Sequence, residues 1–190
     1  MSLTTWAYAL AEDVLAEPLP RRWAHVQGVA ERAKGLRKLF THEDAETLEA
    51  AAVLHDIGYA PALAQTGFHP LDGGRFLRGQ QADPRVTNLV ANHSFALLEA
   101  EERGLRADLA DEFPLERADL VDALVYCDMT TTPDGGLTDT RARVAEIAER
   151  YESGSVVARF IRRAAPEIHA ASDRVEERLA AANTATGHPM

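Results

Sequence analysis

Six histidine and aspartate side chains fall on apolar helical stretches or at their ends, where an unpaired polar group is costly. They are His25, His55, Asp56, His69, His93 and Asp128. A buried carboxylate without a partner costs several kcal/mol, and neutral imidazoles do not offset that cost. A divalent cation would satisfy both carboxylates and all four imidazoles. Mixed imidazole and carboxylate ligands suit iron, manganese or zinc better than calcium or magnesium. The six residues are therefore predicted to be metal ligands.

The stretch AAVLHDIGYA raises a separate question, because it places His55 and Asp56 side by side. Neighbouring side chains in a regular helix point about 100° apart and rarely share a ligand. Gly58 and Pro61 break the helical pattern just after the pair. The backbone can relax at this last turn, so both side chains are predicted to turn toward one ion.

The elements that must position these residues are all predicted to be helices. Apolar residues recur at helical spacing, and no segment alternates convincingly with period two. Thr41 is a predicted N-cap, and Pro70 and Pro84 are predicted to lie in first turns. The stretch from 130 to 136 is predicted to be a loop. The expected helices cover residues 4–17, 21–40, 42–55, a short segment from 69, a segment from 84 to 93, and residues 118–129, 138–151 and 156–181.

The composition predicts one all-α domain, a compact helical bundle over residues 1–182 with its core at about 22–130. Residues 183–190 are predicted to be a flexible tail. The chain has 190 residues, 46% of them hydrophobic, and is rich in Ala, Leu, Glu and Arg, which favour helix. Its Ala- and Leu-rich terminal helices could pack against a second copy, so a homodimer is one expected state.

The charge and the cysteine content of the chain indicate which binding partners and which cellular location to expect. The formal net charge of −10 argues against a nucleic-acid polymer as the partner, while a small anion can still bind at a locally positive site. No apolar stretch approaches the roughly 20 residues that span a bilayer, so no membrane association is expected. The single cysteine, Cys127, suits a reducing cytosol and favours a cytoplasmic location.

The order of the polar residues resembles a known family. His25, then the stretch from His55 to Gly58 that reads HDIG, then Asp128 on a later helix, resembles the HD-domain metal-dependent phosphohydrolase superfamily. The resemblance covers roughly residues 22 to 128. It implies an all-α fold in which His25, His55, Asp56 and Asp128 bind a first metal. It also implies that His69 and His93 hold a second metal, bridged to the first by Asp56.

The same resemblance indicates which branches of the superfamily fit. Arg22 stands three residues before His25, as in members that hydrolyse dinucleoside polyphosphates. Tyr59 replaces the lysine that follows HDIG in the cyclic-dinucleotide phosphodiesterases, and no GYP triplet follows, which disfavours that branch. The chain is also short for the fused synthetase module of the stringent-response enzymes.

The predicted function is therefore metal-dependent hydrolysis of a small phosphate ester or anhydride, with a nucleotide as one candidate substrate. Asp56 and Arg22 are the predicted catalytic residues. The predicted substrate-binding residues are Arg22, Arg75 and Thr131; Arg75 has a solvated surface position as its alternative, and Thr131 lies in a loop expected to rim the site. No GxxxxGK[ST] phosphate loop occurs, which argues against an ATP-dependent phosphotransferase.

Two other functions remain open at this stage. A few superfamily members use the same six-ligand pattern around two irons to activate dioxygen, so a di-iron oxygenase is the first alternative. A non-catalytic domain that keeps its metal for regulation is the second. The cofactor is expected to be one or two divalent transition-metal ions, with iron or manganese favoured over zinc, nickel or cobalt.

Overall fold

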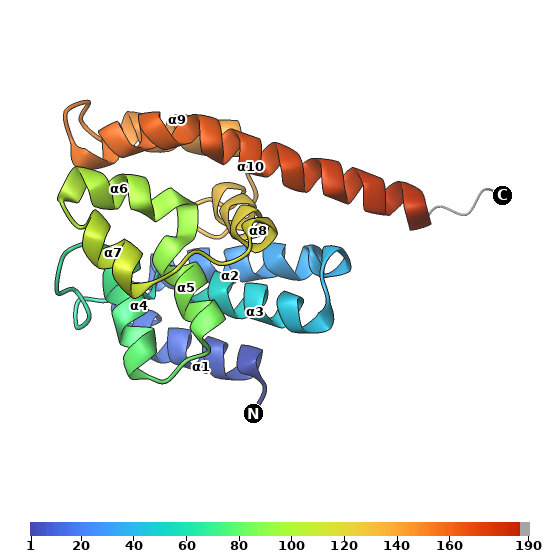
Figure 1. The fold of residues 1–190 in the computed structure, drawn as a ribbon, viewed down its shortest axis with the longest axis horizontal. Helices are drawn as coiled ribbons and strands as arrows, with labels where there is room; N and C mark the ends of the chain where they lie inside the picture. The colour runs from blue at the N-terminus through green and yellow to red at the C-terminus, as the bar shows by residue number, and fades with distance from the viewer. Residues whose placement is uncertain (187–190) are drawn as a thin grey trace.

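The regular structure of the described chain is helical throughout, as predicted. The computed structural model describes the backbone of residues 1–186 and the side chains of residues 1–184. Within that range no strand forms, and only an isolated bridge joins Thr131 and Leu137. The α-helices are α1 (Leu3–Leu15), α2 (Pro20–Gly35), α3 (His42–Leu54), α4 (His69–Gly79), α5 (Pro84–Asn92), α6 (Ala96–Arg103), α7 (Arg106–Glu112), α8 (Ala118–Met129), α9 (Thr140–Arg150) and α10 (Val156–Thr186), with short 3₁₀ turns η1 (Arg37–Leu39), η2 (Ile57–Tyr59) and η3 (His93–Phe95) (Figure 1).

Helix α3 lies at the centre of the domain. It packs against α1, α2, α5 and α8, and every residue from 47 to 54 is buried. A helix that is surrounded on all sides must be apolar on all sides, which explains its run of alanines with Leu48, Val53 and Leu54. Its one long buried acid, Glu49, is paired with Arg37 at 2.6 Å. Because this second half of α3 is buried, its last turn directs side chains into the interior.

Local signals in the sequence start the helices that surround α3. The Thr41 side chain accepts a hydrogen bond from the Asp44 backbone N–H, as the predicted N-cap requires. Pro70 and Pro84 occupy first turns, again as predicted. The helix predicted over residues 21–40 is divided: α2 ends at Gly35 and η1 continues the path.

Helices α6 and α7 were not anticipated from the sequence. Both are short and carry many charges, so their apolar positions are too few to show a helical period. They cover a small apolar cluster that includes Phe68, Leu71 and Phe113. This packing closes the molecule beside α4 and α5.

Helix α10 crosses the whole molecule and packs on α6, α8 and α9 (Figure 1). It is longer than predicted and runs to Thr186, so residues 183–186 of the predicted tail are helical. Residues 187–190 lie outside the described part of the chain. The packing of α10 on earlier helices makes it part of the same all-α domain.

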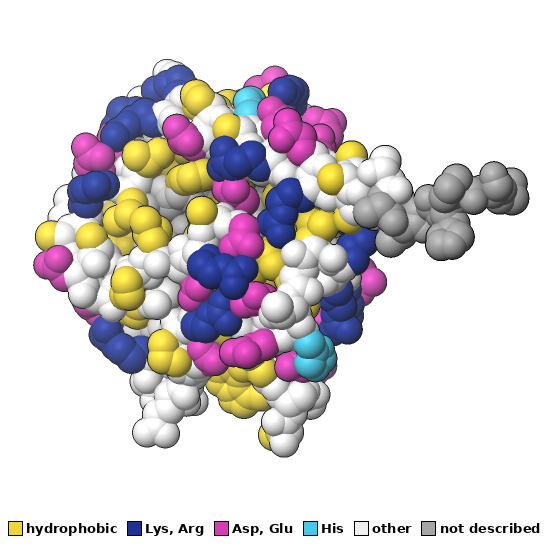
Figure 2. Space-filling model, turned by 45° about the vertical axis from the view of Figure 1, so that its right-hand side comes forward, with side chains coloured by type: hydrophobic (Ala, Val, Ile, Leu, Met, Phe, Trp, Pro, Cys, Tyr) yellow, Lys and Arg dark blue, Asp and Glu magenta, His cyan; other side chains and the backbone are white. Residues whose placement is uncertain are grey.

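Acidic and basic side chains alternate over the face displayed in Figure 2. Many are paired between elements, such as Arg159 with Glu102 at 2.7 Å and Arg174 with Asp122 at 2.7 Å. None of the helices described here combines the length and the apolar composition that a membrane crossing requires.

Two glycines allow the loop after α8 to lie directly on α2. A Cβ on Gly28 would come within 2.5 Å of the Gly135 carbonyl oxygen, and one on Gly135 within 2.4 Å of the Ala24 carbonyl oxygen. Gly135 also has φ +82°, a conformation that side chains disfavour. The contact holds the segment after Asp128 against the helix that carries His25.

Gly58 makes a similar contact between η2 and α4. A Cβ at Gly58 would lie 2.0 Å from the His69 carbonyl oxygen and 2.6 Å from the Gly73 nitrogen. The glycine of the HDIG stretch therefore permits α4 to start directly against the end of α3, which brings His69 toward Asp56.

Replacing Gly58 with alanine should force these backbones apart. We expect Gly58→Ala to lower the free energy of unfolding by about 1–3 kcal/mol, measured by urea denaturation, because the clash is with backbone atoms. Gly35→Ala is the matched control: a Cβ there meets nothing within 4 Å, and alanine should be neutral or stabilising. Equal stability of the two variants would contradict this account of Gly58.

Candidate metal centre

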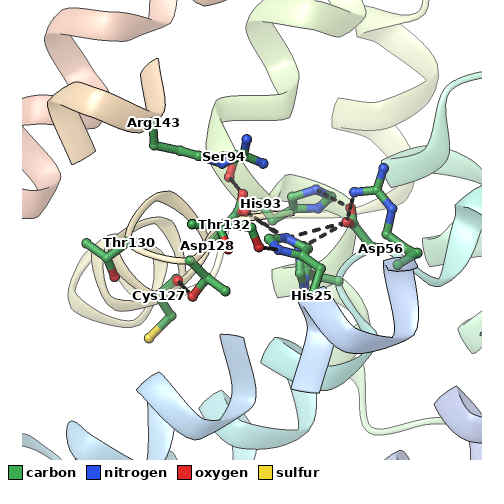
Figure 3. Close-up of polar contacts among 12 residues, drawn as sticks. His25, Asp56, His93, Ser94, Cys127, Asp128, Thr130, Thr132 and Arg143 are labelled. Carbon is green, nitrogen blue, oxygen red and sulfur yellow. Dashed lines mark hydrogen bonds and ion pairs between the residues drawn. The ribbon is translucent and has the colours of Figure 1, made fainter. Parts of the chain in front are cut away.

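The six predicted ligands come together at the ends of several helices. His25 lies in α2, His55 and Asp56 follow the end of α3, His69 opens α4, His93 follows α5, and Asp128 is in the last turn of α8. Figure 3 shows His25, Asp56, His93 and Asp128 around one point. Five of the six residues are buried, and His69 is partly buried.

The first group of donor atoms comprises His25, His55 and Asp128, each with one donor within 4.8 Å of the others. The Nε2 atoms of His25 and His55 lie 3.2 and 3.8 Å from Asp128 Oδ1. His55 Nε2 is buried and has no hydrogen-bond partner. A buried nitrogen without a hydrogen-bond partner costs free energy, so this atom is suited to bind a cation.

The second group comprises Asp56, His69 and His93. Asp56 Oδ1 lies 3.3 Å from His69 Nε2 and 3.8 Å from His93 Nε2, and the two nitrogens are 3.1 Å apart. These separations leave room for one ion among the three donors after small adjustments.

Asp56 connects the two groups through its two oxygens. Oδ2 lies 3.4 Å from His55 Nε2 and 3.8 Å from His25 Nε2, whereas Oδ1 faces the second group. The backbone explains how adjacent residues achieve this: His55 keeps helical angles, but Asp56 leaves the helix at φ −99°, ψ 10°. The predicted relaxation of the last turn of α3 is confirmed.

Backbone carbonyls orient three of the imidazoles. The Nδ1–H groups of His25, His55 and His93 donate to the carbonyl oxygens of Thr132, Ala52 and Val90 at 2.9, 2.8 and 2.6 Å. Since a carbonyl oxygen only accepts, each bond places a proton on Nδ1, and in the neutral ring Nε2 is then the nitrogen that can bind a cation at the centre. The loop held by Gly28 and Gly135 supplies the carbonyl for His25.

The electrostatics of the cluster suit a cation. Burial alone would raise the pKa of Asp56, but the charges of His55 and Arg22 outweigh it and hold that pKa well below its usual value. Asp128 behaves alike: burial opposes ionisation, while the hydrogen bond from His25 and the charge of His55 keep its pKa low. Both carboxylates are therefore anionic donors.

The pKa values of two of the buried histidines, His55 and His93, shift in opposite directions. Burial would lower the pKa of His55, but the Asp56 carboxylate beside it raises that pKa to about 9. Burial and the neighbouring His69 and His55 lower the pKa of His93 to about 3, so His93 is a neutral imidazole. Without metal, a proton on His55 compensates the carboxylates, and a divalent ion would replace that proton.

Arg22 lies against the centre, as predicted. Its Nη1 donates to Asp56 Oδ2 at 2.5 Å, and its guanidinium lies 4.1 Å from the centre of the Tyr59 ring. Tyr59 in turn stacks on His69 with ring centres 3.8 Å apart. The residue that distinguishes this chain from the cyclic-dinucleotide branch thus packs beside both a donor and the arginine.

Ser94 is a functional residue that sequence reasoning missed. Its hydroxyl donates to Asp128 Oδ2 at 2.6 Å, which leaves Oδ1 facing His25 and His55 (Figure 3). The position depends on left-handed angles at Ser94, φ 49° and ψ 36°, just after α5 ends. Serine has no strong preference for the left-handed region, so the sequence does not predict this conformation of Ser94.

Two predicted substrate-binding residues are not brought to the centre. Arg75 does not line the cavity beside the donors; its Nε donates to Glu112 at 3.1 Å, and its side chain is partly exposed. The Thr131 hydroxyl donates to the Cys127 carbonyl oxygen at 2.8 Å and is fully buried. Neither residue lines this cavity, because the Arg75 side chain is paired with Glu112 and the Thr131 hydroxyl with a carbonyl oxygen of α8. Cys127 is buried, and burial raises the pKa of its thiol, so it is a structural residue.

All the donor residues except the fully buried His55 line a cavity of about 140 Å³. Arg22 and Tyr59 line one side, and residues of α9 and α10, among them Arg143, Ile147 and Phe160, line another. A small molecule can therefore reach the donor atoms, and it meets both cations and apolar side chains there.

An all-α protein with a buried histidine–aspartate centre at its helix ends is a metal-binding helical domain by class. The family model of the HD domain matches residues 22–154, and this chain belongs to that family, within the metal-dependent phosphohydrolase superfamily. The match extends the predicted resemblance through α9. No curated protein and no solved structure matches the chain. Members of the family bind divalent metals, which agrees with the two donor groups.

Removal of the Ser94 hydroxyl tests its role in orienting Asp128. We expect Ser94→Ala to weaken binding of Mn²⁺ by roughly 10- to 100-fold, because partners of metal ligands hold them in position. Calorimetric titration of metal-free protein measures this. Ser172→Ala is the control. The buried Ser172 hydroxyl accepts a hydrogen bond from the Thr140 hydroxyl at 2.8 Å and contacts none of the donors. An unchanged affinity in Ser94→Ala would show that Asp128 needs no such support.

Proposed function

We propose that this protein is a metal-dependent phosphohydrolase that cleaves a small phosphate ester or anhydride, of which a nucleotide is one candidate. The observation that carries the proposal is the carboxylate of Asp56, which faces both donor groups and also binds Arg22. One carboxylate between two cation sites, next to a guanidinium, suits a substrate that brings concentrated negative charge.

The proposed ligands divide as the donor groups do. His25, His55, Asp128 and one oxygen of Asp56 would hold one ion, and His69, His93 and the other oxygen of Asp56 would hold a second. The mixed set of imidazoles and carboxylates favours iron or manganese, with zinc, nickel and cobalt as alternatives. Such ions, when bound, supply Lewis acidity and a water of lowered pKa.

The side chains of Arg22 and Tyr59 would bind and orient the substrate. The Asp56 charge keeps Arg22 protonated, and Nη1 of that guanidinium is taken by Asp56. Its remaining N–H groups are free to donate to a non-bridging phosphoryl oxygen. Tyr59 supports the guanidinium from one side, which limits its freedom before substrate binds. The reaction needs no nucleophilic serine or cysteine.

The proposed partner is a small anionic substrate rather than a nucleic-acid polymer or a membrane. Basic residues on the face in Figure 2 are interspersed with acidic ones, and the net charge is −10. A cytoplasmic location is proposed from the single, buried cysteine.

Metal content tests the centre directly. We expect two metal ions per chain in protein purified without chelator or a metal-binding tag, measured by elemental analysis. His69→Ala should retain about one ion and Asp56→Ala should lose both, because Asp56 alone contacts both groups. His42→Ala, at an exposed position, is the control and should retain two. One ion in the wild type would reduce His69 and His93 to cavity residues, and none after reloading would reject the centre.

Dependence on dioxygen separates hydrolysis from the di-iron oxygenase reaction, which the same donors also suit. We expect phosphate release from a panel of phosphate esters and anhydrides to continue under anaerobic conditions, because metal-activated water needs no oxidant. Turnover that stops without dioxygen would reject the hydrolase. A fully metal-loaded protein that turns over neither type of substrate would favour a regulatory role.

A further inference from the structure

Arg143 is a buried cation that the proposed reaction does not yet use. It lies in α9, and its side chain is only 8% exposed. It lines the same cavity as Arg22 and the metal-site donors. Figure 3 shows its side chain reaching from α9 toward Ser94, at the Asp128 side of the centre.

The charge of Arg143 is incompletely compensated. Its Nη1 contacts Glu146, but that carboxylate is 44% exposed and is shared with Arg150. The Nε of Arg143 is buried and has no hydrogen-bond partner among the described residues. A buried donor on a charged group that remains unpaired is costly, so its retention points to a ligand that supplies the acceptor.

The surroundings of Arg143 favour an anion as that ligand. Apolar side chains of α9 and α10, Ile147, Phe160 and Ile161, line the same cavity. In such a setting a guanidinium binds an oxyanion more strongly than it would at the surface. The planar fork of arginine also matches the paired oxygens of a phosphate group.

Arg22 and Arg143 approach different carboxylates of the centre. Arg22 binds Asp56, the residue shared by both donor groups. Arg143 lines the same cavity as Ser94, which binds Asp128 of the first group, and its side chain extends toward Ser94 in Figure 3. A tetrahedral oxyanion placed over the donors would therefore meet a guanidinium from each side.

We propose that Arg143 forms, with Arg22, a two-armed site for a tetrahedral oxyanion, and that the apolar wall of α9 and α10 takes a compact non-polar group attached to it. This rests on the proposed function and specifies its substrate: a phosphorylated compound with its anionic end at the centre. Arg143 binds the substrate directly, whereas Glu146 holds Arg143 in position.

Binding of inorganic phosphate to the metal-loaded protein tests the site without turnover. Titration calorimetry of Arg143→Gln should show phosphate affinity reduced roughly 10- to 100-fold, the loss expected for a charged hydrogen-bonded partner. Metal content should be unchanged. Arg141→Gln removes the same charge from the same helix at a position 65% exposed and should leave phosphate affinity within about twofold of wild type.

A second variant protects the test against misfolding. Arg143→Met replaces the buried cation with a flexible apolar side chain that suits the surrounding wall, so it should fold even where glutamine does not. Phosphate affinity equal to wild type in either folded, metal-loaded variant would overturn the proposal, as would a wild type that binds metal but no phosphate.

Failure of the proposed reaction would look different. Phosphate that binds with the expected dependence on Arg143, in a protein that hydrolyses no phosphate compound, would retain the oxyanion site and reject the hydrolase. If hydrolysis occurs, Arg143→Met should raise KM by more than it lowers kcat, because a binding residue acts on substrate capture.

Discussion

The structure depends on the burial of two carboxylates in one low-dielectric space. Asp56 and Asp128 are both removed from solvent, and neither could stay ionised there without cations on several sides. The compensating groups come from α2, α3, α4 and α5, so these helices must end or cross at one point. The desolvation cost of a buried carboxylate would normally exclude it from a core. Here that cost is offset because the compensating side chains of several helices meet at the two carboxylates.

Helix ends make this arrangement geometrically accessible. In the middle of a helix a side chain is confined to one face, but at an end the chain can change direction, as it does at Asp56 and again at Ser94. Close backbone contacts at Gly58 and Gly135 then hold neighbouring segments in register. Main-chain carbonyls fix the orientation of three of the four imidazoles, so the backbone accounts for much of the precision of the centre.

The sequence predicted the donor set and most of the fold because both have local signals. Polar residues on apolar helical faces identified the six donors, and caps such as Thr41 identified helix starts. The orientation of Ser94 and the placement of Arg143 were missed, because each depends on tertiary contacts. The pairing of Arg75 with Glu112 was missed for the same reason, because the two residues lie on different helices that are far apart in the sequence.

The possible metal ligands and the rest of the cavity lining come from different parts of the fold. The donors lie on the inner helices, where burial of charge leaves little freedom to vary them. Residues of several elements line the rest of the cavity, and the outer helices α9 and α10 contribute Arg143, Ile147, Phe160 and Ile161. A buried arginine in that outer layer is costly unless something acidic occupies the space before it. The inner helices therefore supply the side chains that can hold a cation, and the outer pair contributes part of the lining that a bound molecule would contact.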